Sequence, residues 1–400
     1  MIILVADKLS QSGLDEMVAA GAEVQSIPDL TGDSLVAALT EHNPSVLIVR
    51  STKVPDEALA AAANLQLVVR AGAGYDTIDV DGASARGIFV ANCPGKNAVA
   101  VAELAVGLML AVDRRIPDNV LDAREGRWAK ATYSKAAGIK GGRLALIGMG
   151  NIGRAVAARA RALEMEVCAW SRSLTPESAE GMGVSYRESI LAAVDGADVV
   201  SLHCASTPET AGLANRAFFE AMKDGATFIN TTRSGVVDED ALIWALDNKG
   251  IRAGLDVFSE EPAFKSGPFE SRVATHPSVY VTHHIGASTA QAQGAIADEA
   301  VRVVLAYSRT GEVSNCVNMA AGSDATHQLT VRHLDRVGVL AAVLDEMRRA
   351  EWNVQEMENL LFLGGDSACA YIRFHGSPDQ ETLDRIAGHS DILATSVVKL

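Results

Sequence analysis

The stretch RLALIGMGNIGRAVAARARAL, residues 143–163, decides the fold class. Its beginning is a short apolar run typical of a buried strand, and residues 151–163 have the composition of a helix. The turn between them, GMGNIG, allows a tight bend, a close approach to a pyrophosphate and close packing of the helix, while the helix N-terminus offers free N–H groups to phosphates. This strand–turn–helix context predicts a dinucleotide site. The residues expected to contact the dinucleotide here are Gly148, Gly150, Asn151, Ile152 and Gly153.

The next strand bears on the choice of dinucleotide. An acidic residue at its end would bind the ribose hydroxyls of NAD. Here MEVCAW, residues 165–170, is followed by Ser171 and Arg172 instead. Arg172 could face a 2′-phosphate, or it could lie in solvent while Ser171 binds the ribose. The predicted cofactor is therefore NAD or NADP, with NADP slightly favoured.

Short apolar strands alternate with alanine-rich helical stretches on both sides of this motif. Strands that are apolar throughout suit parallel sheets covered by helices on both faces, so the predicted fold class is doubly wound α/β. The pattern occurs twice, over residues 1–97 and 98–284, and a long helix-like segment, 98–115, joins the two. A further helical segment is expected over residues 288–308.

The end of the chain follows a different order. Small residues are concentrated near residues 318–327, and we place a linker at residues 317–327. Residues 328–400 then have the pattern strand–helix–strand–strand–helix–strand. This βαββαβ order predicts a separate small domain.

Composition and charge argue against several classes of binding partner. The formal net charge of −15 argues against nucleic acids and anionic membranes, and an anionic ligand would need local Arg or Lys residues. No apolar run approaches the roughly 18 residues of a membrane span, and the first residues lack the basic segment of a signal peptide. The five cysteines are scattered, with no CxxC pair, which indicates a reducing compartment, by default the cytoplasm, and excludes the usual zinc spacings. No metal site is predicted.

Three polar residues follow strands downstream of the glycine-rich turn. Arg233 follows ATFIN, Glu261 follows IRAGLDV and His284 follows VYVTH. Because the carboxyl ends of strands line one edge of an open α/β sheet, all three can face a bound nicotinamide. Oxidation of a 2-hydroxy acid needs a base such as histidine and a carboxylate that orients this base. It also needs an arginine that binds the substrate carboxylate through two hydrogen bonds.

Each of these residues also has a plainer interpretation. Arg233 could form a surface ion pair with Asp238 or Glu239. Either Glu260 or Glu261 could be the relevant carboxylate, and one of the adjacent residues His283 and His284 could be structural. Only their joint placement at successive strand ends favours the catalytic interpretation.

Several longer motifs make nearly the whole chain resemble the D-2-hydroxyacid dehydrogenases. They are VRSTKV (49–54), RAGAGYDTID (70–79), NCPGKNAVAVAE (92–103), GMGNIGR (148–154), NTTRSGVVDEDAL (230–242), GLDVFSEEP (254–262) and HHIGAST (283–289). The first, second and last fit the phosphoglycerate branch best. The resemblance implies oxidation of D-3-phosphoglycerate to 3-phosphohydroxypyruvate, the first step of serine biosynthesis, with His284 as acid/base, Glu261 as its partner and Arg233 on the substrate carboxylate.

The resemblance also implies an arrangement of domains and binding residues. Residues 1–97 and 285–316 would form a discontinuous substrate-binding domain, residues 98–284 an inserted NAD(P)-binding domain, and the active site would lie between them. The substrate side is expected to include Arg50, Ser51, Lys53, Arg70, Gly72, Gly74 and Asn97. Further cofactor contacts are expected from His203, Thr207, Thr231 and Asp256.

Three features depart from the family pattern. An acid is missing at Ser171, and His283 stands where the family usually has proline. The loop of residues 262–277 is longer than usual, which loosens the expected spacing between Glu261 and His284.

The C-terminal pattern resembles an ACT domain, an amino-acid-sensing module often found in this family. Serine-sensing members carry His-x-Asn in the first loop and another Asn after the first helix; here the corresponding residues are His333, Asp335 and Asn353. Asp335 keeps an acceptor for an ammonium group but would repel a carboxylate. L-serine is therefore one expected effector, and the alternative is a domain that only pairs subunits. A homodimer or homotetramer is expected.

Two other functions remain open from the sequence. A glyoxylate, hydroxypyruvate or other 2-ketoacid reductase of the same fold would share Arg233, Glu261 and His284. A non-catalytic NAD(P)-binding regulatory protein could also retain them. Turnover of a 2-keto acid distinguishes the last from the enzymes.

Overall fold

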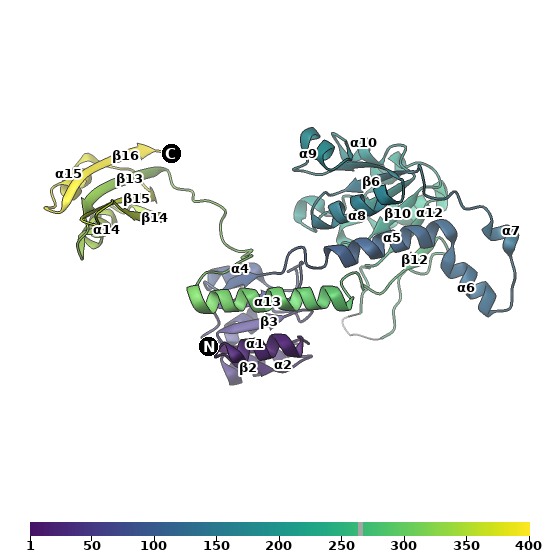
Figure 1. Cartoon of the computed structure of the whole chain (residues 1–400), viewed down its shortest axis with the longest axis horizontal. Helices are drawn as coiled ribbons and strands as arrows, with labels where there is room; N and C mark the ends of the chain where they lie inside the picture. Colours follow the sequence, from purple (N-terminus) through teal and green to yellow (C-terminus); the bar gives the residue numbers. More distant parts are fainter. Residues whose placement is uncertain (263–266) are drawn as a thin grey trace. The chain divides into compact units, whose positions relative to one another are not determined.

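The computed structural model describes residues 1–262 and 267–400. The chain divides into two compact units, Met1–Asn318 and Met319–Leu400 (Figure 1). The first unit contains two parallel sheets and the second contains one antiparallel sheet. The predicted doubly wound α/β class with a separate C-terminal βαββαβ domain is confirmed. None of the helices in the described ranges combines the length and apolar character needed to cross a bilayer.

The first sheet has five parallel strands in the order β2-β1-β3-β4-β5. Its strands are β1 (Ile2–Val5), β2 (Glu23–Ser26), β3 (Val46–Val49), β4 (Leu67–Arg70) and β5 (Phe89–Ala91). Its helices are α1 (Gln11–Ala19), α2 (Asp33–His42), α3 (Asp56–Ala61) and α4 (Val80–Ala85). β3 is buried throughout, as its apolar sequence VLIV predicts, because helices cover both faces.

Helix α13 (Ala290–Thr310) returns to this first sheet from much later in the chain. Its apolar face, which includes Ile296, Ala300 and Val304, shares a core with Ile3 and Val5 of β1. The Thr289 side chain caps its first turn by accepting a hydrogen bond from the backbone N–H of Ala292, at 3.1 Å. We therefore propose that α13 completes the first of the two expected domains.

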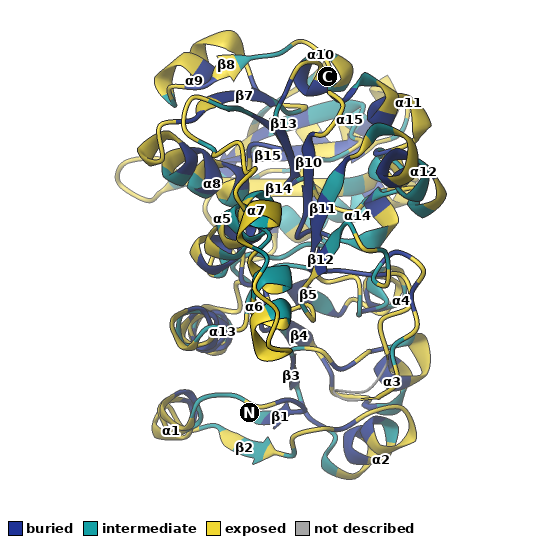
Figure 2. Cartoon of the chain, turned by 90° about the vertical axis from the view of Figure 1, so that its right-hand side faces the viewer, coloured by how far each residue is buried: buried dark blue, intermediate teal, exposed yellow. Residues whose placement is uncertain are grey.

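The second sheet has seven parallel strands in the order β12-β11-β10-β9-β6-β7-β8. Its strands are β6 (Arg143–Ile147), β7 (Glu166–Trp170), β8 (Ser185–Tyr186), β9 (Val199–Leu202), β10 (Thr227–Asn230), β11 (Arg252–Leu255) and β12 (Val279–Val281). The strand order reverses between β6 and β9, which is where ligands bind in doubly wound sheets. Strands β10 and β11 are buried, whereas α11 and α12 expose part of their surface (Figure 2).

Helices cover both faces of this second sheet. One core contains α5, α8 and α9, and the other contains α10, α11 and α12. The bounds are α5 (Ala98–Arg114), α6 (Ile116–Arg124), α7 (Lys130–Tyr133), α8 (Asn151–Ala162), α9 (Pro176–Gly181), α10 (Ile190–Val194), α11 (Arg216–Ala221) and α12 (Glu239–Lys249). Two short 3-10 turns, η1 (Pro208–Thr210) and η2 (Ser234–Val236), follow strand ends. α5 matches the helix expected over 98–115.

The second unit has the strand order β14-β15-β13-β16, antiparallel throughout. Its elements are β13 (His327–Leu334), α14 (Val339–Arg349), β14 (Asn353–Leu361), β15 (Ser367–His375), α15 (Gln380–Ala387) and β16 (Ile392–Lys399). Apolar residues of both helices and all four strands pack together, and Trp352 stacks on Phe374 with ring centroids 4.8 Å apart.

The segment after α13 is bound to the first sheet rather than being a free linker from residue 317. The backbone N–H of Asn92 donates to Asn315, and that of Val317 donates to Val90 of β5. The Asn318 side chain accepts from the Val90 N–H at 2.8 Å. Residues 317 and 318 of the expected linker thus belong to the first unit, because β5 is an edge strand with backbone groups to satisfy.

Glu299 of α13 connects this helix to the segment that follows it and to the loop after β5. Its carboxylate accepts hydrogen bonds from Arg302 at 2.6 and 3.0 Å and from Asn315 at 2.7 Å, and it pairs with Lys96 at 3.2 Å. The hydrogen bonds from Arg302, with those from Asn315 and Lys96, outweigh burial and lower the pKa of Glu299 to about 2. The carboxylate is therefore a nearly buried anion with three partners.

We expect Glu299→Gln to lower the free energy of unfolding by about 2–3 kcal/mol at pH 7, since the partners lose a buried charge. Because the pKa is lower in the folded state, the stabilisation is complete above the usual value of 4.5 and is lost as the pH falls toward about 2. Urea unfolding at pH 7 and pH 3 measures both points. The exposed Glu312 supplies a control, Glu312→Gln; an equal loss in the two variants would contradict the role of Glu299.

Candidate active site

The register of the second sheet aligns the ends of its strands. Ile147 of β6 lies opposite both Trp170 of β7 and Leu202 of β9. Leu202 lies opposite Asn230 of β10, which lies opposite Leu255 of β11. The residues that come next in the chain therefore share one edge of the sheet. These are the predicted site residues Gly148, Ser171, His203, Thr231 and Asp256.

The glycine-rich turn leaves no room for side chains at two of its positions. A Cβ atom on Gly148, where φ is +108°, would lie 2.5 Å from the His203 carbonyl, and one on Gly153 would lie 2.1 Å from the Gly148 oxygen. Gly150, by contrast, faces open space at the start of α8. Asn151 begins that helix and approaches Gly95, and Ile152 is half-buried beside its core. The turn has the shape that a pyrophosphate requires.

Six buried side-chain polar atoms have no hydrogen-bond partner among the described residues. Four of the six such side-chain atoms belong to predicted site residues: Nε of Arg70, Oδ1 of Asn97, Nδ1 of His203 and Oγ1 of Thr231. Burial lowers the pKa of His203 to about 3, so its imidazole is neutral, and its Nε2 lies 2.9 Å from the Ser201 hydroxyl. Unpaired buried groups are rare, so their occurrence at His203 and Thr231, directly after β9 and β10, indicates a ligand site at this edge.

The other expected cofactor residues lie on the rim of the same edge. Ser171 is half-buried directly after β7, and Arg172 is exposed. The Arg172 charge acts on Glu209 and helps lower its pKa, after the larger contribution of the Thr207 hydrogen bond. Thr207 caps η1, and its backbone N–H donates to the Thr210 hydroxyl at 2.8 Å.

His284 and Glu261 form a direct hydrogen bond, with Nδ1 and Oε2 2.7 Å apart. The other Glu261 oxygen accepts from the backbone N–H of Phe258 at 2.9 Å. Burial raises the pKa of Glu261, but the bonds from His284 and Phe258 and the charges of His284 and Arg233 outweigh it and lower that pKa overall. Of the alternatives left open by the sequence, the structure joins His284 rather than His283 to Glu261 rather than Glu260.

Asp256 holds the loop that carries His284. Its buried carboxylate accepts from the Thr282 hydroxyl at 2.6 Å and from the backbone N–H groups of Ile285 and Gly286, both at 2.9 Å. Its carbonyl accepts from the His284 N–H. These bonds stabilise the left-handed backbone of His284, whose φ is +51°. Asp256 was expected to bind the cofactor; its contacts indicate that it supports His284.

Arg233 pairs with Asp76 and not with Asp238 or Glu239. Its Nε and Nη2 donate to the two Asp76 oxygens at 3.3 and 3.1 Å, and its Nη1 donates to the Thr232 carbonyl at 2.8 Å. Arg233 follows β10 of the second sheet, whereas Asp76 lies in the loop after β4 of the first sheet. This ion pair connects the two parts of the first unit.

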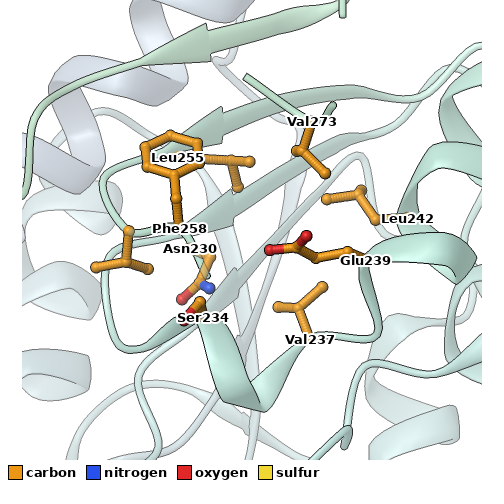
Figure 3. A pocket seen from close by; sticks show the side chains of 9 residues that line it. Asn230, Ser234, Val237, Glu239, Leu242, Leu255, Phe258 and Val273 are labelled. Carbon is orange, nitrogen blue, oxygen red and sulfur yellow. The ribbon is translucent and has the colours of Figure 1, made fainter. Parts of the chain in front are cut away.

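A small pocket beside the end of β10 lies close to these residues (Figure 3). It is lined by Asn230, Ser234, Val237, Glu239, Leu242, Leu255, Val257, Phe258 and Val273. The Glu239 carboxylate points into it and accepts from the Ser259 hydroxyl and, at 3.3 Å, from the Ser259 backbone N–H. Because Ser259 belongs to the loop that carries Glu261, Glu239 supports that loop. None of the three predicted catalytic residues lines the pocket.

The first sheet supplies cations from its own strand ends. Arg50 directly follows β3, and Arg70 is the last residue of β4, which pairs with β3. Burial and the charge of Arg233 lower the pKa of Arg70 to about 10. A Cβ on Gly72 would overlap the Arg70 guanidinium, and one on Gly74 would lie 2.2 Å from Nη2 of Arg233. Both glycines therefore allow the loop to pass close to the arginines.

Asp7 holds the neighbouring loop of residues 50–53. It accepts from the backbone N–H groups of Arg50 at 2.7 Å and of Ser51 and Thr52 at 3.1 Å, and also from the Ser51 hydroxyl. Burial raises the pKa of Asp7, but these bonds outweigh it and lower that pKa overall. The Ser51 hydroxyl is therefore engaged with Asp7, while Lys53 is exposed on the same loop.

Sequence reasoning missed four residues of this site: Asp7, Asp76, Glu239 as a loop support, and Thr282. Asp76 stands within the quoted motif RAGAGYDTID, and Glu239 within NTTRSGVVDEDAL. An acidic residue inside a motif that also holds the expected substrate residues Arg70, Gly72 and Gly74 is the signal that could have drawn attention to Asp76. Asp7 offers no comparable signal. Part of the long loop, residues 263–266, lies outside the described residues.

Two of the three residues expected to bind an effector in the second unit, His333 and Asn353, lie opposite different ends of β15. His333 lies opposite Ala368 of β15, whereas Asn353 lies opposite His375, at the other end of that strand. Buried His333 is engaged at both nitrogens, with the Leu334 carbonyl at 2.7 Å and Asn359 at 3.1 Å. The backbone N–H of Asp335 donates to Asp366. Spacing along the chain does not reveal strand register, and the effector role of these residues stays a prediction.

The chain is similar to known proteins along most of its length. Residues 106–286 match the family model described as "D-isomer specific 2-hydroxyacid dehydrogenase, NAD binding domain". D-3-phosphoglycerate dehydrogenase of Archaeoglobus fulgidus is 34% identical over 86% of this chain and 64% of its own length. The enzyme of that name from Mycobacterium tuberculosis is 38% identical over 88% of this chain and 66% of its own length.

A solved structure extends the similarity to three dimensions. The TT0316 protein from Thermus thermophilus has a TM-score of 0.70 and 33% identity, over 79% of this chain and 100% of that one. The chain thus spans just under two thirds of the length of the two curated relatives.

Proposed function

The chain belongs to the family of D-isomer-specific 2-hydroxyacid dehydrogenases, and we propose that it oxidises D-3-phosphoglycerate to 3-phosphohydroxypyruvate with a nicotinamide dinucleotide. The observation that carries this proposal is the hydrogen bond between His284 and Glu261, with Arg233 close enough for its charge to act on Glu261. An imidazole held by a carboxylate beside a guanidinium is the set that oxidation of a 2-hydroxy acid needs.

In the proposed reaction, the substrate loses a hydride from C2 and a proton from its hydroxyl. Hydride acceptance is the chemistry that the bound dinucleotide supplies. Because Nδ1 of His284 is bonded to Glu261, Nε2 is the nitrogen left to take the hydroxyl proton. The lowered pKa of Glu261 keeps its carboxylate ionised at neutral pH, so it stabilises the imidazolium that this transfer creates.

Binding of the substrate is assigned to cations from both sheets. Arg233 binds the carboxylate next to the reacting carbon through two hydrogen bonds. Arg50, Arg70 and Lys53 then serve the phosphate, which needs local positive charge in a chain of net charge −15. The names of the two curated relatives support phosphoglycerate over unphosphorylated acids.

The cofactor site fits a dinucleotide by its own geometry. The turn has no room for a side chain at Gly148 or Gly153, and Oγ1 of Thr231 is a buried hydroxyl without a partner among the described residues. Exposed Arg172 supports binding of a 2′-phosphate, but the Glu209 carboxylate beside it opposes a further anion. NAD is therefore the proposed main cofactor, and NADP a weaker one.

The C-terminal unit is assigned to pairing of subunits into a homodimer or homotetramer, with L-serine as the alternative ligand. Both ring nitrogens of His333 have partners inside the unit, which favours the pairing role. Millimolar L-serine should then leave the rate unchanged, and light scattering should give a mass above 42.0 kDa. Inhibition by L-serine, or a monomer, would contradict this assignment.

A matrix of cofactors and substrates tests the proposed function. Reduction of 3-phosphohydroxypyruvate, hydroxypyruvate, glyoxylate and 2-oxoglutarate is measured with NADH and with NADPH. The highest kcat/KM is expected for 3-phosphohydroxypyruvate with NADH. A preference for hydroxypyruvate or glyoxylate would identify a reductase of the same family. Absence of turnover with every pair would leave a non-catalytic dinucleotide-binding protein.

A further inference from the structure

The contact between Asp76 and Arg233 joins residues 157 positions apart in the chain. Asp76 is in the loop that follows β4, and Arg233 follows β10, so the two side chains come from different sheets of the first unit. Both carboxylate oxygens of Asp76 take part, one accepting from Nε and the other from Nη2. Two parallel bonds fix the plane of the guanidinium as well as its position.

A count of N–H groups shows what remains of Arg233. A guanidinium has five N–H groups. Asp76 accepts from two of them, and the Thr232 carbonyl accepts from one on Nη1. One N–H remains on Nη1 and one on Nη2. These two belong to the terminal nitrogens, the pair that can fork a second carboxylate.

Asp76 also lies among several cations. Burial raises the pKa of Asp76, but the hydrogen bond and charge of Arg233, with the charge of Arg70, outweigh it and lower that pKa overall. The charges of Arg233 and Arg50 both act on Arg70, with the opposite sign to that of Asp76. Without Asp76, Arg233 would lose the carboxylate that is hydrogen-bonded to it and would still face the charge of Arg70. Repulsion would then move its flexible side chain away.

The backbone around Asp76 is adapted to this contact. A Cβ on Gly74 would lie 2.2 Å from Nη2 of Arg233 and 2.9 Å from Oδ1 of Asp76. The loop after β4 therefore passes the ion pair at a distance that only glycine allows.

From this geometry we infer that Asp76 is a positioning residue for Arg233: it holds one edge of the guanidinium so that the remaining N–H groups of Nη1 and Nη2 face the substrate carboxylate. The inference rests on the proposed function, in which Arg233 binds that carboxylate. Asp76 itself does not touch the substrate. Its effect is therefore expected in substrate binding rather than in binding of the dinucleotide.

An ordinary surface ion pair would have no such effect, and the chain offers a matched example. Arg86 pairs with Asp56 through two bonds of 2.6 and 2.9 Å, and the side chains are 33% and 60% exposed. In the Arg233–Asp76 pair the corresponding exposures are 32% and 60%. Asp56→Asn thus removes a similar ion pair that contains none of the proposed site residues.

The test compares Asp76→Asn, Asp76→Glu and Asp56→Asn in steady-state assays with 3-phosphohydroxypyruvate, or with the best substrate of the matrix. Asparagine keeps the size of the side chain but cannot accept both bonds as a carboxylate does. We expect Asp76→Asn to raise the KM for the keto acid by about 10–100-fold, with the KM for NADH unchanged. Asp76→Glu should recover part of the loss, and Asp56→Asn should remain within about twofold of the wild type.

Two further readouts distinguish positioning of Arg233 by Asp76 from a direct effect of the Asp76 charge on the substrate. If Asp76 merely competes with the substrate, its removal should lower KM, and that result would overturn the inference. If Asp76 acts through Arg233, the double variant Asp76→Asn/Arg233→Lys should be little worse than Arg233→Lys alone. Additive effects would overturn the inference as well.

A binding measurement keeps the test independent of turnover. Oxalate carries a carboxylate next to a second oxygen-bearing carbon, as 2-keto acids do, and should raise the melting temperature of the wild type and Asp56→Asn but much less that of Asp76→Asn. Equal shifts in all three, with Arg233→Lys impaired, would overturn only the role of Asp76. No shift in the wild type together with no turnover would reject the proposed function itself.

Discussion

Replacing His284 with alanine should lower kcat by about 10²–10⁴-fold at neutral pH, the usual loss when a positioned acid/base is removed. The reason is the geometry at Nδ1, where Glu261 accepts at 2.7 Å and leaves Nε2 for the substrate hydroxyl. Alanine removes the imidazole that takes the proton in the proposed reaction. Binding of NADH should change little, because the glycine-rich turn is untouched. The measurements are kcat in both directions and NADH fluorescence on binding.

The adjacent residue provides the control for this variant. His283 is exposed, and the hydrogen bond to Glu261 is made by His284. His283→Ala should therefore retain most of kcat. Near-normal turnover of His284→Ala, or a larger loss in His283→Ala, would move the acid/base role away from His284 and contradict the proposed reaction.

Replacing Arg233 with lysine should raise the KM for the keto acid by about 10–100-fold, since a charge-assisted hydrogen bond is worth about 1.5–3 kcal/mol. Lysine retains the charge but has no planar fork. It cannot bind both oxygens of Asp76 and the Thr232 carbonyl while it presents two further N–H groups to a substrate. Saturation curves for the keto acid and for NADH measure the effect on each ligand.

Arg86→Lys serves as the control for Arg233→Lys. It also breaks a two-bond pair with a carboxylate, at matched exposure, but far from the glycine-rich turn in the chain. It should leave both KM values unchanged. If Arg233→Lys leaves KM and kcat unchanged as well, Arg233 is structural and the substrate carboxylate is bound elsewhere.

Much of the fold could be predicted because local patterns are strong in the parallel sheets. Runs such as LALI (144–147) and VLIV (46–49) are apolar throughout, and these residues are buried. Gly148 and Gly153 could be assigned from the motif because a side chain at either position would overlap the backbone. The grouping of Arg233, Glu261 and His284 also followed from strand ends, since parallel strands finish at the same edge.

The supporting contacts could not be predicted because they depend on distant segments. Asp76 meets Arg233 only through the fold of two different sheets, and Asp7 supports the loop of Arg50 from another strand end. In the second unit, His333 and Asn353 were grouped by analogy, but antiparallel register places them at opposite ends of β15. Register depends on pairing across the sheet, which spacing in one strand does not reveal.

The bonds that residues 315–318 make along β5 determine where the chain can be severed safely. A stop codon or protease cut after Asn318 would spare the hydrogen bonds of Val90 with Val317 and Asn318. A cut a few residues earlier would remove these hydrogen bonds and leave backbone N–H and C=O groups of the edge strand β5 unpaired, so that they could pair with other chains. A truncated protein without the C-terminal unit should therefore keep residues 315–318, because their hydrogen bonds belong to the first unit.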